Sequence, residues 1–460
     1  MNETRPDGGW TSPGPMNGTD TLFWRLSKDP LTRPHVAWLW FLESAPEGDA
    51  FLRACAGATR RLPRLTHRVA EAPLRTGLPA WTPDPDFRLA RHAHRMRLPA
   101  RGGRRELLDL VEWRMSAAFD PLHPPWEITL VEGYETDRAA IVLKWHHSLG
   151  DAVTMVAAVR RLMAADPPGR PAAPPPGCGR PGAALGTPAA LSRAAHGLAR
   201  DTRTVLREGV HALSVPGAAG GAARLAGRVA AQLLQPVSPS PLLAERSSAI
   251  HCDTVTVPLA GLKAAGRAAG VSVTSAYVSA VLGAFHRYHD HHGLVRATLP
   301  VLVPISFRER HETGAGNLVA GLLIPGPIGD MSARTRMLRV HHAVTEARGT
   351  VSRGVFAVMA DLGALVPGPL YAPLAPALLR AVDVVVTSVP GLPGTARAAG
   401  ARVVNAVPWA PRGGAAANIS MASHGDLCGI GTNLDPAAVT DPRLFLRFLE
   451  ESFEETLAHA

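Results

Sequence analysis

The chain has 460 residues, more than a single hydrophobic core usually serves, so its length predicts two domains. Its four cysteines lie far apart and form no Cys-x-x-Cys pair, which argues against a zinc site and a disulfide framework and favours a reducing cytoplasm. The formal net charge of +10 favours anionic partners, but nucleic acid is not expected, because the basic residues are scattered and aromatic residues make up only 5%.

The sequence shows neither a secretion signal nor a clean membrane span. Residues 1–15 are polar and lack an apolar core, so we expect a disordered extension there. The stretch closest to a span, residues 362–379, is uncharged but contains four prolines, which would break a spanning helix. It favours a buried loop with a short helix, or alternatively an apolar surface that rests on lipid or admits an acyl chain. We therefore expect a cytoplasmic protein, with peripheral contact to a membrane or to lipid inclusions left open.

The first part of the chain alternates strand and helix patterns. Residues 34–43 are aromatic-rich and alternating, which indicates a strand, and residues 128–132 and 139–144 indicate a strand pair around a Gly-Tyr-Glu-Thr-Asp turn. These elements predict a mixed α/β domain over residues 16–165. Apolar residues at helical spacing predict its helices, over 49–62, 105–118 and 153–164.

A change of composition separates this unit from the rest. Residues 166–187 are rich in proline, glycine and alanine and can bury too little to fold, whereas residues 188–235 return to helical spacing. We interpret residues 166–249 as a linker with crossover helices. Residues 250–460 repeat the α/β character, so a pair of similar α/β sandwiches is the predicted fold. The predicted strands of the second unit are 252–259, 297–304, 318–324, 383–389, 402–407, 416–424 and 427–433, and its predicted helices are 262–270, 273–288, 332–349 and 441–457.

A paired histidine follows the last strand pattern of the first unit, in the sequence Trp145-His146-His147-Ser148-Leu149-Gly150-Asp151-Ala152. Side chains at a strand end commonly border a cleft. An imidazole, with an ordinary pKa of about 6.5, is well suited to take a proton from an alcohol near neutral pH. Such a base needs a partner that fixes its tautomer. Asp151 either fills that role or pins the turn by pairing with a distant arginine, and the sequence leaves both options open.

Other histidine groups are better explained as parts of helices. His341-His342 is followed by Glu346 at the same spacing, but residues 334–348 repeat basic and apolar positions at helical intervals, which predicts an amphipathic helix. The four histidines between residues 286 and 292 match no standard zinc spacing and are expected at a solvated helix end. We therefore predict no metal site.

Four separated segments carry a resemblance to a known family. The histidine segment is similar to an HHxxxDG signature, with Ala152 in place of the final glycine. The other segments are Phe119-Asp120-Pro121-Leu122 with Pro124-Pro125-Trp126-Glu127, Val303-Pro304-Ile305-Ser306-Phe307-Arg308 with Gly316-Asn317, and Thr387-Ser388-Val389-Pro390-Gly391. Together they resemble the bacterial wax ester synthase/diacylglycerol acyltransferases, within the superfamily of coenzyme A-dependent acyltransferases that includes condensation domains. The resemblance extends from about Met16 to Leu457. Ser388 stands where the family has asparagine, and Thr274-Ser275 stands where many members carry Asn-Asp.

The resemblance implies a fold and roles for the motif residues. The expected fold is two chloramphenicol-acetyltransferase-like α/β sandwiches that form a pseudo-dimer around a central cleft or tunnel. His147 would be the general base that takes the proton of an acceptor hydroxyl, which attacks the thioester of acyl-CoA without a covalent acyl-enzyme. His146 would point back into the fold, and Asp151 would hold the loop.

Further residues are assigned by the same resemblance. Ser388, or backbone N–H groups up to Gly391, would stabilise the developing oxyanion. Asn317 would be a side-chain donor at the cleft, although a turn-forming Gly-Asn pair explains it equally well. Trp126 is expected at the substrate site.

The expected reaction is transfer of a fatty acyl group from acyl-CoA, a co-substrate, to diacylglycerol or a long-chain alcohol, with no bound cofactor. Two alternatives stay open. One is acyl transfer or condensation onto another alcohol or an amine, with the acyl group delivered on a carrier protein. The other is a catalytically silent lipid-binding protein. Because the paired domains already supply an interface, we expect a monomer.

Overall fold

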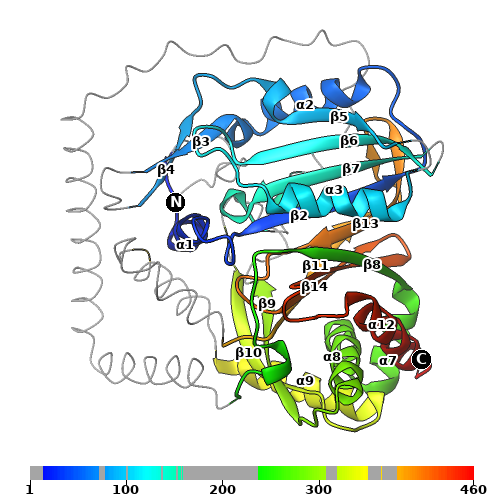
Figure 1. The fold of residues 1–460 in the computed structure, drawn as a ribbon. Helices are drawn as coiled ribbons and strands as arrows, with labels where there is room; N and C mark the ends of the chain where they lie inside the picture. The colour runs from blue at the N-terminus through cyan, green and yellow to red at the C-terminus, as the bar shows by residue number, and fades with distance from the viewer. Residues whose placement is uncertain are drawn as a thin grey trace, which may run out of the picture.

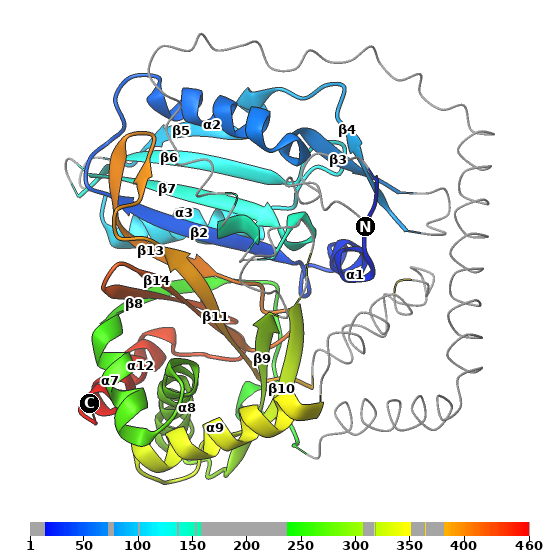
Figure 2. The same cartoon turned by 180° about the vertical axis from the view of Figure 1, so that it is seen from behind.

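The computed structural model shows two six-stranded sheets, one in the upper and one in the lower half of the molecule, with helices packed against them (Figures 1 and 2). A small three-stranded sheet flanks the upper one. This arrangement confirms the predicted α/β architecture. The structure describes residues 14–459 except 72–77, 100–101, 136–137, 152–153, 157, 159–236, 307–316, 318, 351–363 and 365–380.

The first sheet is buried on both faces. All eight residues of β2 (His35–Leu42) are buried, because its alternate side chains pack beneath α2 (Ala50–Arg61) on one face and α3 (Arg104–Ser116) on the other. The strand order is β12-β13-β2-β7-β6-β5. The remaining strands are β5 (Ala93–Arg97), β6 (Trp126–Tyr134), β7 (Arg138–His146), β12 (Arg397–Ala398) and β13 (Ala401–Trp409).

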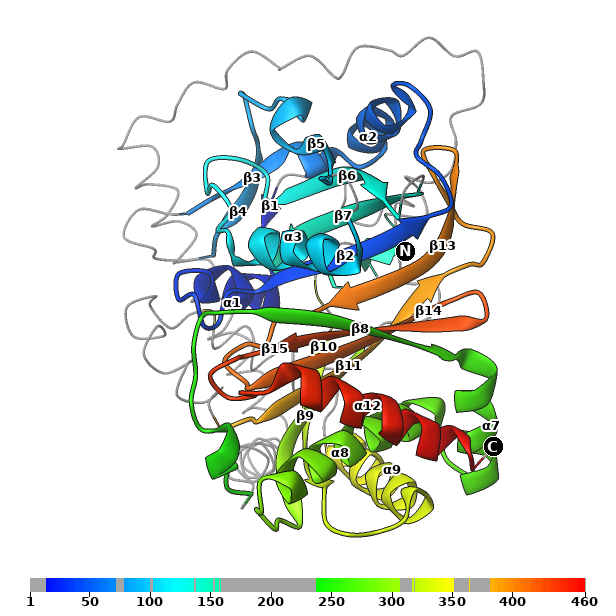
Figure 3. The same ribbon diagram turned by 45° about the vertical axis from the view of Figure 1, so that its right-hand side comes forward.

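The second sheet has the order β10-β9-β11-β14-β15-β8, and its helices cover one face (Figure 3). Of these, α8 (Val273–His291) is the most deeply buried, and Ser272 caps its start by accepting from the Ser275 N–H. The strands are β8 (His251–Pro258), β9 (Thr298–Ser306), β10 (Val319–Pro327), β11 (Val384–Leu392), β14 (Ala417–His424) and β15 (Leu427–Leu434), and the other helices are α7 (Leu259–Ala269), α9 (Ala333–Thr350) and α12 (Pro442–Leu457).

A strand from the second unit completes the sheet of the first unit. Although β13 comes late in the chain, it pairs antiparallel with β2 of the first sheet. It also lies against β15, where glycine allows a close approach: a Cβ at Gly429 or at Gly431 would sit 2.2 Å from a carbonyl oxygen of β13. The domain boundary at residue 250 stays a prediction, but residues 397–409 belong to the sheet of the first unit.

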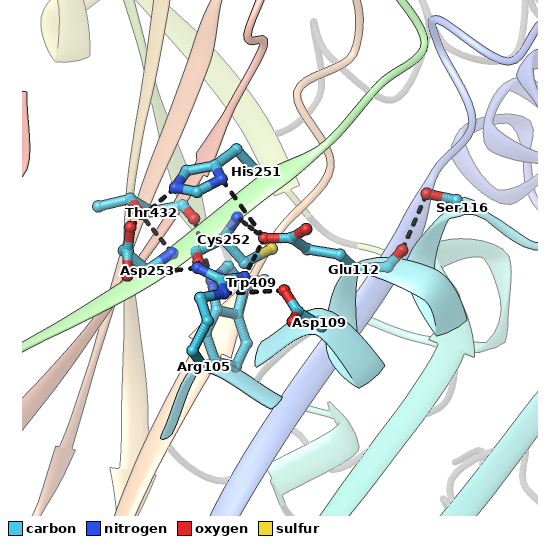
Figure 4. A network of polar contacts seen from close by, with 9 residues as sticks. All are labelled: Arg105, Asp109, Glu112, Ser116, His251, Cys252, Asp253, Trp409 and Thr432. Atoms are coloured by element: carbon cyan, nitrogen blue, oxygen red, sulfur yellow. Dashed lines mark hydrogen bonds and ion pairs between the residues drawn. The ribbon is translucent and has the colours of Figure 1, made fainter. Parts of the chain in front are cut away.

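A polar network ties α3 to the edge strand β8 (Figure 4). Glu112 accepts from the Cys252 N–H at 2.7 Å, and Arg105 donates to the Cys252 carbonyl oxygen at 3.1 Å. Arg105 and Glu112 also pair with each other at 2.5 Å. Side chains of one unit thus satisfy backbone groups that an edge strand would otherwise expose, and this contact holds the two units together.

Several elements near the N-terminus have no counterpart in the sequence predictions. They are β1 (Gly14–Pro15), α1 (Gly18–Leu26), β3 (His67–Ala70), β4 (Ala80–Pro83) and β5. Other predictions fall outside the described residues: the extension up to residue 13, the linker from 166 to 236, and residues 362–379 apart from Ala364. Of the helix predicted over 153–164, residues 154–156 and 158 are described and are helical.

Among the described residues, no single helix has the length and hydrophobicity to cross a membrane. The pair α7 and α8 passes on length and composition only when taken together, and the two helices meet at a bend of 98°.

Candidate active site

The paired histidines lie where β7 ends and a single 3₁₀ turn, His147–Leu149, begins. Two backbone bonds fix this point: the His146 N–H donates to the Pro125 carbonyl oxygen and the His147 N–H donates to that of Pro34, both at 2.9 Å. The apolar run of β7 therefore delivers the motif to the end of the first sheet, as its sequence pattern predicts.

His146 points into the protein interior. Its Nδ1 lies 2.7 Å from the Ser148 hydroxyl and its Nε2 lies 2.5 Å from the Ser27 hydroxyl, while the Trp24 indole packs edge-on against the ring. Burial lowers the pKa of His146 to about 3, so the ring is neutral across the physiological range. These contacts support the architectural role that the resemblance implies.

His147 as a whole residue is partly exposed. The Phe23 ring stacks on the imidazole, with centroids 4.2 Å apart. Its Nδ1 is buried and has no hydrogen-bond partner among the described residues. Removal of water lowers the pKa of His147, and this outweighs the opposite effect of the Asp151 charge. The ring is therefore an unprotonated base at neutral pH.

Asp151 pins the turn that follows. Its carboxylate accepts from the Thr154 N–H at 2.8 Å, which is the bond of an N-cap at the start of a helix. It is almost completely buried. Of the two roles left open by the sequence, this contact supports the one in which Asp151 holds the loop, through a backbone N–H.

Asn317 reaches the motif from the second unit. Its Nδ2 donates to the His147 carbonyl oxygen at 2.8 Å and to Asp20 Oδ1 at 2.6 Å, and its backbone N–H donates to the same Asp20 oxygen at 3.0 Å. The predicted side-chain donor therefore lies beside the motif and binds the backbone of His147.

Asp20 was not identified from the sequence, although it joins the two units at the motif. It lies in the first turn of α1, where the Asn17 side chain accepts from its N–H. Burial raises the pKa of Asp20 to about 7, against the opposing effects of the Asn317 bonds and of the Arg64 charge. An Asn-x-x-Asp spacing is a helix-start signal, but nothing local indicates that this acid meets a residue 297 positions away.

The other predicted site residues lie on β6 and β11. Trp126 is buried and its indole N–H donates to the Leu65 carbonyl oxygen at 2.7 Å. Ser388 is partly exposed on β11. A Cβ at Gly391 would lie 1.3 Å from the Ser423 carbonyl oxygen, so glycine is required there by the adjacent strand. Among the described residues, neither Ser388 nor Gly391 makes a hydrogen bond to His147, and their oxyanion role stays a prediction.

The remaining histidine groups lie in the second unit. His342 is exposed on α9, 3.8 Å from Glu346, and the amphipathic helix predicted there is present. Within the described ranges, no group of three or more His, Cys, Asp or Glu side chains is placed to hold a metal ion.

Similar proteins extend over nearly the whole chain. A putative diacylglycerol O-acyltransferase of Mycobacterium tuberculosis is 29% identical over 474 residues, covering 97% of this chain and 92% of the relative. The solved structure of a wax ester synthase/diacylglycerol acyltransferase from Marinobacter aquaeolei VT8 superposes with a TM-score of 0.62 at 22% identity, covering 96% and 98% of the two chains. The first condensation domain of the calcium-dependent antibiotic synthetase superposes with a TM-score of 0.61 at 14% identity, covering 98% and 96%.

Two family models match the sequence directly. The wax ester synthase/diacylglycerol acyltransferase catalytic domain matches residues 16–277, which is more than half of the chain. The C-terminal domain of the same family matches residues 315–456. The chain therefore belongs to the wax ester synthase/diacylglycerol acyltransferase family and is an acyltransferase.

Proposed function

We propose that this acyltransferase moves a fatty acyl group from acyl-CoA to the hydroxyl of diacylglycerol or of a long-chain alcohol, with His147 as the general base. The observation that carries the proposal is the environment of His147: a neutral imidazole stacked on Phe23, in a partly exposed residue whose backbone is anchored by Asn317 of the second unit. The named activities of the relatives support the choice of donor and acceptor.

In this mechanism His147 takes the hydroxyl proton as the hydroxyl oxygen attacks the thioester carbonyl carbon. The resulting oxyanion collapses, the carbon–sulfur bond breaks, and the coenzyme A thiolate takes the proton back from the imidazolium. The products are the ester and free coenzyme A, so atoms and charge balance. A base of this kind contributes typically about 10²–10⁴-fold to the rate, and alignment of two bound substrates contributes further.

The test replaces His147 with alanine and measures transfer from palmitoyl-CoA to diacylglycerol, hexadecanol and a long-chain amine. We expect kcat/KM for the hydroxyl acceptors to fall by about 10²–10⁴-fold. The matched control is His342→Ala, because His342 belongs to a second His-His-x-x-x-acid sequence but is exposed on α9. Near-parental transfer by a folded His147→Ala protein would exclude His147 as the general base. Preferred transfer to the amine would exclude a hydroxyl as the acceptor.

We further propose that the protein is a monomer that contacts lipid surfaces peripherally. Strand β13 joins the first sheet and packs on β15, so the two units already bury an internal interface. The net charge of +10 suits anionic headgroups. Flotation with anionic and with neutral liposomes at low and high salt should show binding to the anionic vesicles that weakens with salt. Light scattering during gel filtration should give the mass of one chain.

A further inference from the structure

We propose that Asp20 and Asn317 act together to fix the tautomer of His147, so that the neutral ring keeps its proton on Nδ1 and presents a bare Nε2 to the acceptor hydroxyl. The inference rests on the proposed function, in which His147 is the base. A neutral imidazole accepts a proton only through the nitrogen that carries none. A base of this kind therefore needs a contact at its other nitrogen that decides where the ring proton sits.

The contacts of Asn317 admit one orientation of its side-chain amide. The amide lies 2.6 Å from Asp20 Oδ1 and 2.8 Å from the His147 carbonyl oxygen. The same Asp20 oxygen also accepts the backbone N–H of Asn317, at 3.0 Å. Because both neighbours are accepting oxygens, the amide NH₂ group must face them and the amide oxygen must face away. Asp20 thereby decides which end of the amide remains for the imidazole.

Two buried atoms at this contact have no hydrogen-bond partner among the described residues, namely Asn317 Oδ1 and His147 Nδ1. The amide oxygen can only accept, whereas Nδ1 donates when it carries the ring proton. Burying either atom unpaired is unfavourable. A hydrogen bond from Nδ1–H to Oδ1 satisfies both atoms, and the bond from Asn317 to the His147 backbone already holds the two side chains together.

The electrostatics of the ring agree with an acceptor at Asn317. Burial has the largest effect on the pKa of His147 and lowers it, whereas contacts with its own backbone and with the Asn317 side chain raise it. An acceptor raises the pKa of an imidazole because it stabilises the protonated ring, and a donor would lower it. The Phe23 ring, stacked at 4.2 Å and 17°, hinders the half-turn of the imidazole that would move Nδ1 away from Asn317.

The direct test observes the tautomer. Nitrogen NMR of protein labelled in its histidine rings distinguishes a protonated ring nitrogen from a bare one, and the His147 signals are those that disappear in His147→Ala. At about pH 8, above the ordinary histidine pKa of about 6.5, the parent should carry the proton on Nδ1. Asn317→Leu and Asp20→Ala should each move a measurable share of it to Nε2. A parent protonated on Nε2, or parental His147 signals in both variants, would overturn the proposal.

Two further variants separate positioning from a general loss of stability. Asp20→Asn keeps an accepting oxygen, so it should hold the Asn317 amide as the parent does and keep the Nδ1 proton. Asn433→Leu removes a similar buried amide, whose Nδ2 donates to the Ala410 carbonyl oxygen at 3.0 Å and whose Oδ1 has no hydrogen-bond partner among the described residues. It should leave the His147 signals unchanged. Equal shifts in Asn433→Leu and Asn317→Leu would overturn the proposal.

Kinetics separate this inference from the proposed function. In Asn317→Leu and Asp20→Ala, kcat for transfer from palmitoyl-CoA to a hydroxyl acceptor should fall about 10–100-fold, the usual loss when a group that orients a histidine through its other ring nitrogen is removed. A shifted tautomer with parental kcat would support the positioning pair and exclude His147 as the base. A lowered kcat with the parental tautomer would overturn the positioning pair and leave the base in place. Should Asn317→Leu not fold, Asp20→Ala carries the test.

Discussion

Asp20 connects the two units at the site through its buried carboxylate. One of its oxygens accepts both the backbone and the side-chain N–H groups of Asn317, and Asn317 in turn holds the His147 backbone. Burial destabilises the ionised form of this carboxylate relative to the protonated form, which is why the pKa of Asp20 rises to about 7.

Replacing Asp20 with asparagine should change how stability depends on pH. The folded state raises the Asp20 pKa above its unfolded value of about 3.9, so the folded protein binds more protons between about pH 4 and 7 and loses stability as pH rises through that window. Asp20→Asn keeps an accepting oxygen but carries no charge.

The measurement is thermal unfolding of the parent and Asp20→Asn proteins between pH 4 and 8. The stability of the variant relative to the parent should increase with pH, by an amount on the order of 4 kcal/mol at most. Asp20→Ala, which removes the acceptor as well, should be less stable than Asp20→Asn at every pH. A difference between variant and parent that does not change with pH would contradict the raised pKa.

At the residue scale, the sequence predicts the site residues that local patterns and motifs mark. The histidines follow a recognisable strand and carry a recognisable signature, and the structure places Asn317 beside them as the resemblance implies. Asp20 and Phe23 are missed because their contacts with Asn317 and His147 join distant parts of the chain. The motif spacing contains no information about those contacts.

At the scale of elements, α1 is the largest surprise and the most consequential one. Besides Asp20, this nine-residue helix supplies Phe23 to His147 and Trp24 to His146, and Ser27 follows at its C-terminal end. Its sequence gives a weak signal because glycine and two threonines occupy its first four positions. Tertiary contacts with the motif loop, rather than intrinsic helix preference, account for its place in the fold.

Strands and helices with strong periodicity are predicted well. The patterns over 34–43 and 49–62 correspond to β2 and α2 within one residue at each end. Short strands such as β3 and β4, of four residues each, offer too few positions for alternation to be recognised. They escape prediction for that reason.

The contact between α3 and β8 makes a prediction at this scale. Glu112→Ala should destabilise the protein by about 1–3 kcal/mol, because it leaves the Cys252 N–H without its acceptor and removes a partner of Arg105. Asp109→Ala is the matched control, since it removes only an exposed ion pair to the same arginine and should cost about 0.5 kcal/mol or less. Urea unfolding of both variants checks this, and equal losses would show that the backbone bond is unimportant.

At the scale of the whole molecule, the two units are interlocked rather than joined in series. Residues 397–409 extend the first sheet although they follow most of the second unit in sequence, and β13 packs closely on β15 of the second sheet. Chain order predicts a pair of sandwiches but not the insertion of β13 into the first sheet, because a strand pattern does not identify the neighbouring strand. The shared strand fixes one unit against the other. The hydrogen bond from Asn317 to the His147 backbone depends on that fixed arrangement.

The central claim is that the neutral imidazole of His147 is the base, held at the junction of the two units. The most direct measurement is kcat/KM for acyl transfer between pH 5 and 9 in the parent and in His147→Ala. We predict that the parental kcat/KM falls on the acid side because a single group, the His147 imidazole, becomes protonated. This fall should occur only below about pH 6.5, because burial lowers the pKa of His147. The variant should show a low rate without that acid limb. A variant that keeps the same limb, or the parental rate, would contradict the account.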